Sequence, residues 1–408
     1  MERVESSRSS TVAFFLCLIT AIFEGADNVS LGLAAPRVAK ELGLHPSQMG
    51  LALSASLIGL MLGSFLGGRL ADWVGRKRVL IISMATLGVF SLATTVARGF
   101  TELLLLRFVV GLGIGGAFPI LIAMASETSS PGRRAGAIGL VYSGQPLGAA
   151  LLSLLVSLLG VTVNWRAIFY VGGFGPLLLV PLLMVFLPES TAFREARSKG
   201  AAHSAAAQSI GSVLFGQGRA AATVLLWVSC AFTLFVVYVL LNWIPSLMLG
   251  KGLNGPQGSM VSMTLNLGGA VGVLVFGAIV DKGFHKPAII GCYLVLLLSL
   301  AGLAALSAYP LMLIFAGFAG LSMLGSQLVL YSLAADYYPT LCRGTGLGAM
   351  VSVGRIGGVT APFAAGLLLS AGYDAKAVLS TAVACVFIAA ALAVVLLAHA
   401  PPARLERP

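Results

Sequence analysis

The stretch GGRLADWVGRKR at residues 67–78 joins two apolar segments, and GAIVDKG at residues 277–283 echoes it 209 positions later. At this offset Asp72 aligns with Asp281 without a gap. Asp and Glu number only 14 in 408 residues, so repeated acidic positions carry weight. The chain is therefore predicted to be two parallel six-helix halves related about an axis along the membrane normal. Further aligned pairs are Pro36/Pro245, Gln48/Gln257, Gly59/Gly268, Gly63/Gly272, Gly68/Gly277, Glu127/Asp336, Arg134/Arg343, Gly139/Gly348 and Gly148/Gly357.

The composition is that of a membrane protein. Mean hydropathy is +0.99, with 58% apolar and 10% charged residues, which excludes an ordinary soluble globule. Runs of about 20 apolar residues are long enough to cross a bilayer as helices. Twelve are predicted, at 11–35, 48–70, 78–98, 102–125, 135–160, 166–187, 221–248, 258–280, 287–308, 310–334, 345–370 and 376–398.

The expected fold is an all-α membrane protein with two six-helix bundles. The first bundle covers residues 1–187, the second covers 221–408, and the polar, alanine-rich segment 188–220 links them on the cytoplasmic side. The first run is expected to be retained as a helix, because no small-residue cleavage site follows it. With the N-terminus inside, seventeen of the 25 lysine and arginine residues fall on the cytoplasmic side, so both termini are predicted to be cytoplasmic. The net charge of +11 follows from this bias and is no evidence for nucleic-acid binding.

Four charged residues lie well inside the predicted helices: Glu24, Asp27, Arg107 and Arg355. A charge at a helix centre costs about 2.5–3.5 kcal/mol, so such residues usually face a cavity or a partner. At 1.5 Å per residue, Asp27 and Arg107 lie about 12 and 8 Å below the outer surface. Glu24 lies about 16 Å from the outer surface and Arg355 about 15 Å from the cytoplasmic end of its helix, so both are near the midplane. Matching depths predict pairing of Asp27 with Arg107 and of Glu24 with Arg355. A purely structural ion-pair network is the alternative, although buried pairs stabilise poorly compared with apolar packing.

Residues 67–78 resemble the signature between helices 2 and 3 of the major facilitator superfamily. The segment 107–116, RFVVGLGIGG, resembles a further motif of that superfamily. In the first helix, Glu24-Gly25-Ala26-Asp27 resembles the acidic-Gly-x-Asp motif of the aromatic acid:proton symporters, over residues 11–398. Most members carry aspartate first, and glutamate is closer to the 3-hydroxyphenylpropionate transporters. The sequence LNWIP at 241–245 and the spacing of Arg343 and Arg355 belong to the same resemblance.

The resemblance implies proton-coupled import of a small aromatic carboxylate by alternating access. Burial favours a protonated carboxyl and a nearby arginine favours the ionised form, so movement of Arg107 would switch the proton affinity of Asp27. Asp27 is the preferred proton carrier, with Glu24 coupled to it or to substrate. Arg355 is the expected anchor for the substrate carboxylate, because a guanidinium binds it bidentately. Further expected substrate contacts are Phe118, Tyr142, Gln145, Tyr238, Asn242, Asn266 and Gln327, and expected gating residues are Asp72, Arg76, Glu127, Arg134, Asp281, Asp336 and Arg343.

Two other readings of function remain open. A proton/drug antiporter would have acidic pocket residues without a cationic anchor, which Arg355 argues against, and a non-transporting receptor would bind without flux. A membrane enzyme is disfavoured, because no catalytic or metal cluster is visible: the histidines are far apart and the cysteines lack metal or disulfide spacing. We expect no cofactor beyond the coupling proton and no nucleic-acid partner. A monomer surrounded by lipid in the bacterial inner membrane is expected.

Overall fold

The structure is a computed structural model that describes residues 2–127, 134–160, 164–190, 193, 214–216, 219–338 and 343–398; within them, the side chains of 2–10, 72, 134–135, 335–336 and 343–345 are not described. Over these ranges it contains twelve helices long and apolar enough to cross a membrane, as predicted. They are α1 (Glu2–Leu42), α2 (Pro46–Val74), α3 (Arg76–Thr94), α4 (Phe100–Glu127), α5 (Arg134–Leu159), α6 (Trp165–Phe186), α9 (Ala220–Gly250), α10 (Gly255–Asp281), α11 (His285–Ala305), α12 (Tyr309–Tyr337), α13 (Arg343–Ser370) and α14 (Ala375–Ala398).

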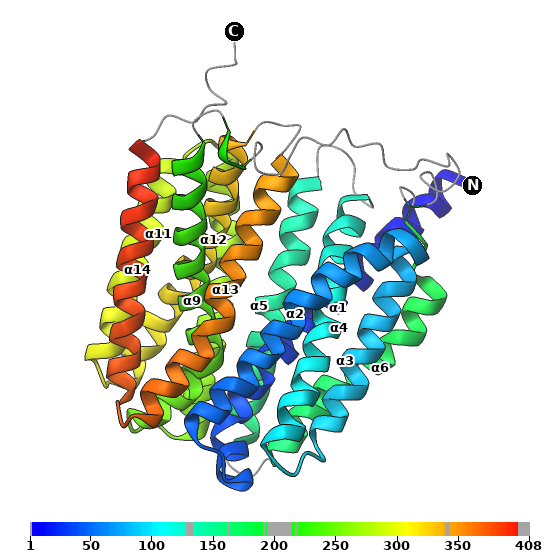
Figure 1. The fold of residues 1–408 in the computed structure, drawn as a ribbon. Coiled ribbons are helices and arrows are strands. Elements are labelled where there is room, and N and C mark those ends of the chain that lie inside the picture. Colours follow the sequence, from blue (N-terminus) through cyan, green and yellow to red (C-terminus); the bar gives the residue numbers. More distant parts are fainter. Residues whose placement is uncertain are drawn as a thin grey trace.

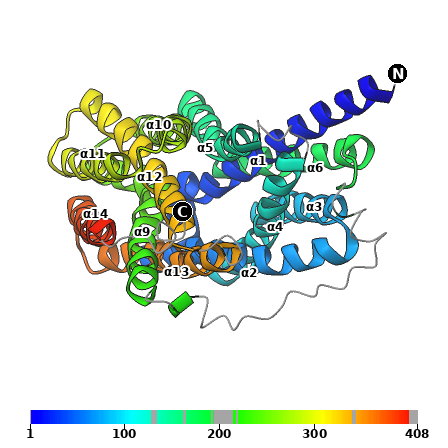
Figure 2. The same cartoon turned by 90° about the horizontal axis from the view of Figure 1, so that it is seen from above.

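The helices form two groups, α1–α6 and α9–α14, that stand side by side (Figures 1 and 2). Within the first group α2 packs on α4, α1 on α5 and α3 on α6, and within the second α10 packs on α12, α9 on α13 and α11 on α14. These are equivalent pairs at the offset of 209 residues. The groups meet through α5 with α10 and through α2 with α13, again an equivalent pair, and through α1 with α9. The packing therefore follows the repeat in the sequence. The predicted linker, 188–220, falls largely outside the described residues.

Repeated glycines mark repeated helix contacts. A Cβ added at Gly148 on α5 would lie 1.8 Å from the carbonyl oxygen of Ile22 on α1. At the equivalent position, a Cβ at Gly357 on α13 would lie 1.9 Å from the carbonyl oxygen of Ala231 on α9. Real atoms cannot approach so closely, so both helix pairs need glycine here for backbone contact.

The repeated glutamines mark helix starts. The side chain of Gln48 in the first turn of α2 accepts a hydrogen bond from the backbone N–H of His45 at 3.0 Å, and Gln257 in α10 accepts from Asn254 at 3.1 Å. Asn254 returns the contact by accepting from the Gln257 backbone N–H at 2.9 Å. Such reciprocal bonds satisfy donors that a helix N-terminus leaves unpaired. The second helix of each group, α2 or α10, thus begins with the same hydrogen bond from a backbone N–H to a glutamine side chain.

The first helix is longer than predicted. Its expected end at residue 35 is wrong, because α1 continues through Pro36 to Leu42. Proline is tolerated inside a membrane helix when neighbouring groups compensate for the lost hydrogen bond. We name the face where α1 begins and α14 ends the near face, and the face where α1 ends and α2 begins the far face (Figure 1).

Several hydrogen bonds between the two helix groups lie toward the far face. Ser47 N–H donates to Ser370 Oγ at 2.8 Å, and Ser157 Oγ donates to the Pro256 carbonyl at 2.9 Å. Further from that face, Ser54 Oγ donates to the Val359 carbonyl at 2.7 Å, and the hydroxyls of Ser153 and Ser262 lie 3.2 Å apart. These contacts hold the groups together on the far side of the cavity described below.

Candidate functional site: a buried acid pair beside a polar cavity

The predicted pairing of Asp27 with Arg107 is present at the centre of the first helix group. Arg107 Nη2 lies 2.8 Å from Asp27 Oδ2, and Nη1 donates to Oδ1 at 3.3 Å. Asp27 is fully buried and Arg107 is 1% exposed. The bidentate geometry is the strong form of an arginine–carboxylate contact.

Residues from three further helices surround this ion pair. Ser91 on α3 donates its hydroxyl to Asp27 Oδ1 at 3.0 Å, and Arg107 Nε donates to Ser56 Oγ on α2 at 3.3 Å. The guanidinium carbon lies 5.6 Å from the ring centre of Phe169 on α6. Both charges are therefore paired and hydrogen-bonded inside the first helix group. No pattern in the sequence predicted these three partners.

Glu24 has a different environment from Asp27. It is fully buried, and its Oε2 accepts a hydrogen bond from Gln145 Nε2 on α5 at 3.1 Å. Its other oxygen, Oε1, is buried with no hydrogen-bond partner among the described residues. Although the two acids are three residues apart, Asp27 contacts α3 and α4 while Glu24 contacts α5. They are thus separate sites on one helix.

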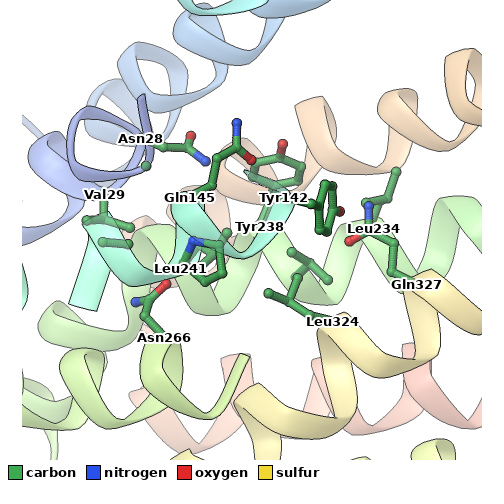
Figure 3. Close-up of a pocket in the computed structure, with 14 residues that line it drawn as sticks. Asn28, Val29, Tyr142, Gln145, Leu234, Tyr238, Leu241, Asn266, Leu324 and Gln327 are labelled. Atoms are coloured by element: carbon green, nitrogen blue, oxygen red, sulfur yellow. The ribbon is translucent and has the colours of Figure 1, made fainter. Parts of the chain in front are cut away.

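A cavity lies between the two helix groups, with about 510 Å³ of atom-free space, part of it open to solvent. It is bounded by α1 and α5 from one group and by α9, α10 and α12 from the other (Figure 3). Four amide side chains and two phenols face apolar residues across it. The lining residues are Gly25, Asn28, Val29, Tyr142, Gln145, Pro146, Ala149, Leu234, Val237, Tyr238, Leu241, Asn266, Leu324 and Gln327.

Five of the predicted substrate residues line this cavity: Tyr142, Gln145, Tyr238, Asn266 and Gln327. The other three do not. Phe118 packs on the Tyr142 ring with centroids 5.8 Å apart, and Asn242 donates to the Tyr238 carbonyl at 2.9 Å. Each residue therefore contacts a cavity-lining tyrosine, Phe118 through the ring of Tyr142 and Asn242 through the backbone of Tyr238.

Arg355 also lies outside the lining, and its predicted pairing with Glu24 is wrong. Its Nη1 donates to Ser64 Oγ at 3.0 Å and to the Leu60 carbonyl at 3.3 Å, both on α2. Depth along the membrane normal, used for the prediction, does not specify the direction in which a side chain leaves its helix.

Asn28 is a cavity residue that the sequence analysis missed. It lies four residues after Glu24, so the two share one side of α1. The four-residue spacing from Glu24 could have identified Asn28 from the sequence.

The second helix group has no acid at the equivalent place. Thr233, at the position that aligns with Glu24, lies 2.7 Å from the hydroxyl of Tyr293, which is also 3.3 Å from Ser229 Oγ. Ser229 donates to the Ala389 carbonyl at 3.0 Å. Neutral hydroxyls thus replace the carboxylate, and the buried acids Glu24 and Asp27 have no acidic counterpart in the second half.

The predicted gating residues are only partly visible. Arg76 at the start of α3 forms an ion pair with Glu127 at the end of α4, and Ser190 Oγ donates to Glu127 at 2.7 Å. Glu189 accepts from the Lys77 backbone N–H at 3.1 Å. Asp281 is exposed. The side chains of Asp72, Arg134, Asp336 and Arg343 lie outside the described residues.

Comparison with known proteins gives the family. The model described as Major Facilitator Superfamily matches residues 16–362 and 252–408. The chain belongs to this superfamily. It is 41% identical to the 3-(3-hydroxy-phenyl)propionate transporter of Escherichia coli over 95% of this chain and 94% of that protein, and 31% identical to the gallate transporter of Pseudomonas putida over 94% and 91%. These relatives are aromatic acid transporters, as the first-helix resemblance implied, and the chain is a transporter rather than an enzyme.

Solved structures give the same fold. A bacterial homologue of the human lysosomal transporter Spinster matches with a TM-score of 0.75 at 16% identity, over 94% of this chain and 96% of that chain. The xylose transporter XylE from E. coli matches with a TM-score of 0.71 at 16% identity, over 92% and 94%. The transporter is thus a multi-pass membrane protein with the major facilitator fold.

Proposed function

We propose that this transporter imports a small aromatic carboxylate, of the hydroxyphenylpropionate or hydroxybenzoate kind, together with protons by alternating access. The observation that carries the proposal is the cavity between the two helix groups, with a buried carboxylate hydrogen-bonded to its wall through Gln145. Relatives named as transporters of 3-(3-hydroxyphenyl)propionate, gallate and 4-hydroxybenzoate support the substrate class.

The cavity chemistry suits an aromatic acid. Apolar side chains such as Leu234, Leu241 and Leu324 provide walls for a ring. The amides of Asn28 and Asn266 offer both donors and acceptors for carboxylate and hydroxyl groups. Ligand sites commonly combine a mostly apolar lining with a few placed polar groups.

The acids provide the proton sites. Glu24 has no cationic partner among the described residues, so protonation removes the cost of an unpaired buried charge. Asp27 is paired with Arg107 in this state, and it is the proposed proton acceptor in a state in which the pair has separated. Arg355 is bonded to α2, so it anchors the substrate carboxylate only in a state in which α13 has moved relative to α2.

The direction follows from the two faces. We assign the near face to the cytoplasm, because the positive-inside bias puts both termini there. The far-face serine contacts then close the outside, and this state receives or releases substrate on the cytoplasmic side. We propose that the protein acts as a monomer in the bacterial inner membrane. Arg76 and Glu127 form a cytoplasmic gate contact whose partners exchange between states.

Uptake of radiolabelled 3-(3-hydroxyphenyl)propionate into proteoliposomes tests the proposal. With the outside acidic, the substrate accumulates above its external concentration. Benzoates, phenylacetates and non-aromatic acids are then ranked by how strongly each inhibits this uptake. A drug/proton antiporter accumulates its substrate only under the opposite gradient, and a receptor binds without flux. Either result overturns the proposal. An added membrane potential separates one proton per anion from two, because a net charge contributes about 2.3 kcal/mol per 100 mV.

A further inference from the structure

Gln145 is the contact between the buried acid and the cavity. Its Nε2 donates to Glu24 Oε2 at 3.1 Å, while its side chain also lines the cavity (Figure 3). Glu24 itself is fully buried and does not line the cavity. A Cβ at Gly25 would lie 1.8 Å from the Gln145 carbonyl oxygen, so α1 and α5 are in backbone contact here. This close packing holds the amide next to the carboxyl group.

Glu24 has no counter-charge among the described residues. The helices packed on α1 are α2, α4, α5, α6 and α9. The titratable groups with described side chains that lie at least five residues from the ends of these helices, α1 included, are Cys17, Asp27, Arg37, Arg69, Arg107, Tyr142, Tyr170, Cys230 and Tyr238. Of the three arginines, Arg107 is bound to Asp27, Arg37 donates to the Gly160 carbonyl toward the far face, and Arg69 lies toward the near-face end of α2. A change in the protonation of Glu24 therefore affects neighbouring groups mainly through its hydrogen bond to Gln145.

The ionised state of Glu24 admits one orientation of this amide, whereas the protonated state also admits the opposite orientation, which gives its O–H an acceptor. An ionised carboxylate only accepts hydrogen bonds, so it takes an N–H of Gln145 and leaves the amide oxygen for the cavity. A protonated carboxyl donates its O–H, and the amide oxygen is the available acceptor on Gln145. The amide N–H groups then turn to the cavity.

We propose that Gln145 is a donor–acceptor switch that couples protonation of Glu24 to binding of the anionic substrate in the cavity. This inference rests on the proposed function, and it names the residue that links proton binding to substrate binding. With Glu24 ionised, the amide oxygen faces the cavity and repels a carboxylate. With Glu24 protonated, amide N–H groups face the cavity and bind the carboxylate. Protonation of Glu24 and binding of the anion therefore favour each other, which is the coupling that symport needs.

The test measures substrate affinity between pH 6 and 9 by calorimetry on the purified transporter, with 3-(3-hydroxyphenyl)propionate as the probe. In the unmodified protein the affinity is level at the acid end and then falls with a slope that approaches about tenfold per pH unit once Glu24 is ionised in the free protein, as one linked proton requires. Gln145→Leu keeps the side-chain bulk but removes the amide, so binding weakens and the slope falls to near zero. Gradient-driven accumulation falls while substrate exchange continues.

Two further variants make the result specific. Glu24→Gln is permanently neutral and can donate, so it loses the slope while holding the low-pH affinity across the range. Asn266→Leu removes a cavity amide that donates to its own helix at Ser262, not to Glu24; affinity falls and the slope persists. A Gln145→Leu protein that keeps the slope, or a Glu24→Gln protein that binds weakly at every pH, overturns the inference. Failure of the unmodified protein to bind or accumulate any aromatic acid overturns the proposed function instead.

Discussion

Removing the negative charge at Asp27 should destabilise the first helix group and abolish proton-driven accumulation. In Asp27→Asn, Arg107 remains fully charged and buried, and it loses a carboxylate that contacts it through two nitrogens at 2.8 and 3.3 Å. Breaking a buried pair from one side costs about 3–5 kcal/mol, because an uncompensated charge is left behind. Ser91 also loses its charged acceptor at 3.0 Å.

Removing both charges separates the structural role of the pair from its role in transport. The double variant Asp27→Asn/Arg107→Gln leaves neutral amides that can hydrogen-bond to each other. We expect it to be more stable than the sum of the single variants predicts, with a coupling free energy of about 1–3 kcal/mol. Its accumulation of substrate should nevertheless stay at background, because no proton site coupled to Arg107 remains.

The assay has two readouts on the same four proteins. Reversible unfolding in mixed micelles titrated with SDS gives the coupling free energy, and proteoliposome uptake under an inward proton gradient gives accumulation. Additive losses of stability would refute the ion-pair argument. Undiminished accumulation by Asp27→Asn would refute its part in proton coupling, whatever its stability.

Three other changes test the fold and the alternating-access account. The hydroxyls of Ser153 and Ser262 lie 3.2 Å apart, so the double variant Ser153→Cys/Ser262→Cys should form a disulfide that blocks transport until a reductant is added. Undiminished transport by the cross-linked protein would show that the far face need not open. Gly148→Ala should cost about 1–3 kcal/mol because its Cβ would lie 1.8 Å from a carbonyl oxygen of α1, and Gly139→Ala on the same helix, with nothing within 4 Å, is the control in thermal unfolding. Lys251→Met should lower thermal stability, since Lys251 donates to carbonyl oxygens at the end of α11; an unchanged melting temperature would contradict this capping role.

The fold follows from the sequence because its determinants are local or repeated. Apolar length sets the twelve spans, and the aligned pair Gly148 and Gly357 marks equivalent backbone contacts. The boundary at Pro36 was misplaced because proline ends most helices in water but is compensated within a packed bundle.

For the site residues, only the depth along the membrane normal could be predicted from the sequence. Helical rise placed Asp27 level with Arg107, and the structure pairs them. The same reasoning failed for Glu24 and Arg355, which have matching depths but contact α5 and α2 respectively. The packing between helices decides the direction of each side chain, and this packing cannot be predicted from a single sequence.

The direct test of proton-coupled import follows the proton itself. Proteoliposomes loaded with a pH-sensitive dye receive 3-(3-hydroxyphenyl)propionate outside with no imposed gradient, and protein-free liposomes correct for passive entry of the neutral acid. The account predicts acidification of the lumen in step with labelled substrate uptake, and its loss in Glu24→Gln and Asp27→Asn. Substrate entry with an unchanged lumen pH, or with alkalinisation, would contradict it.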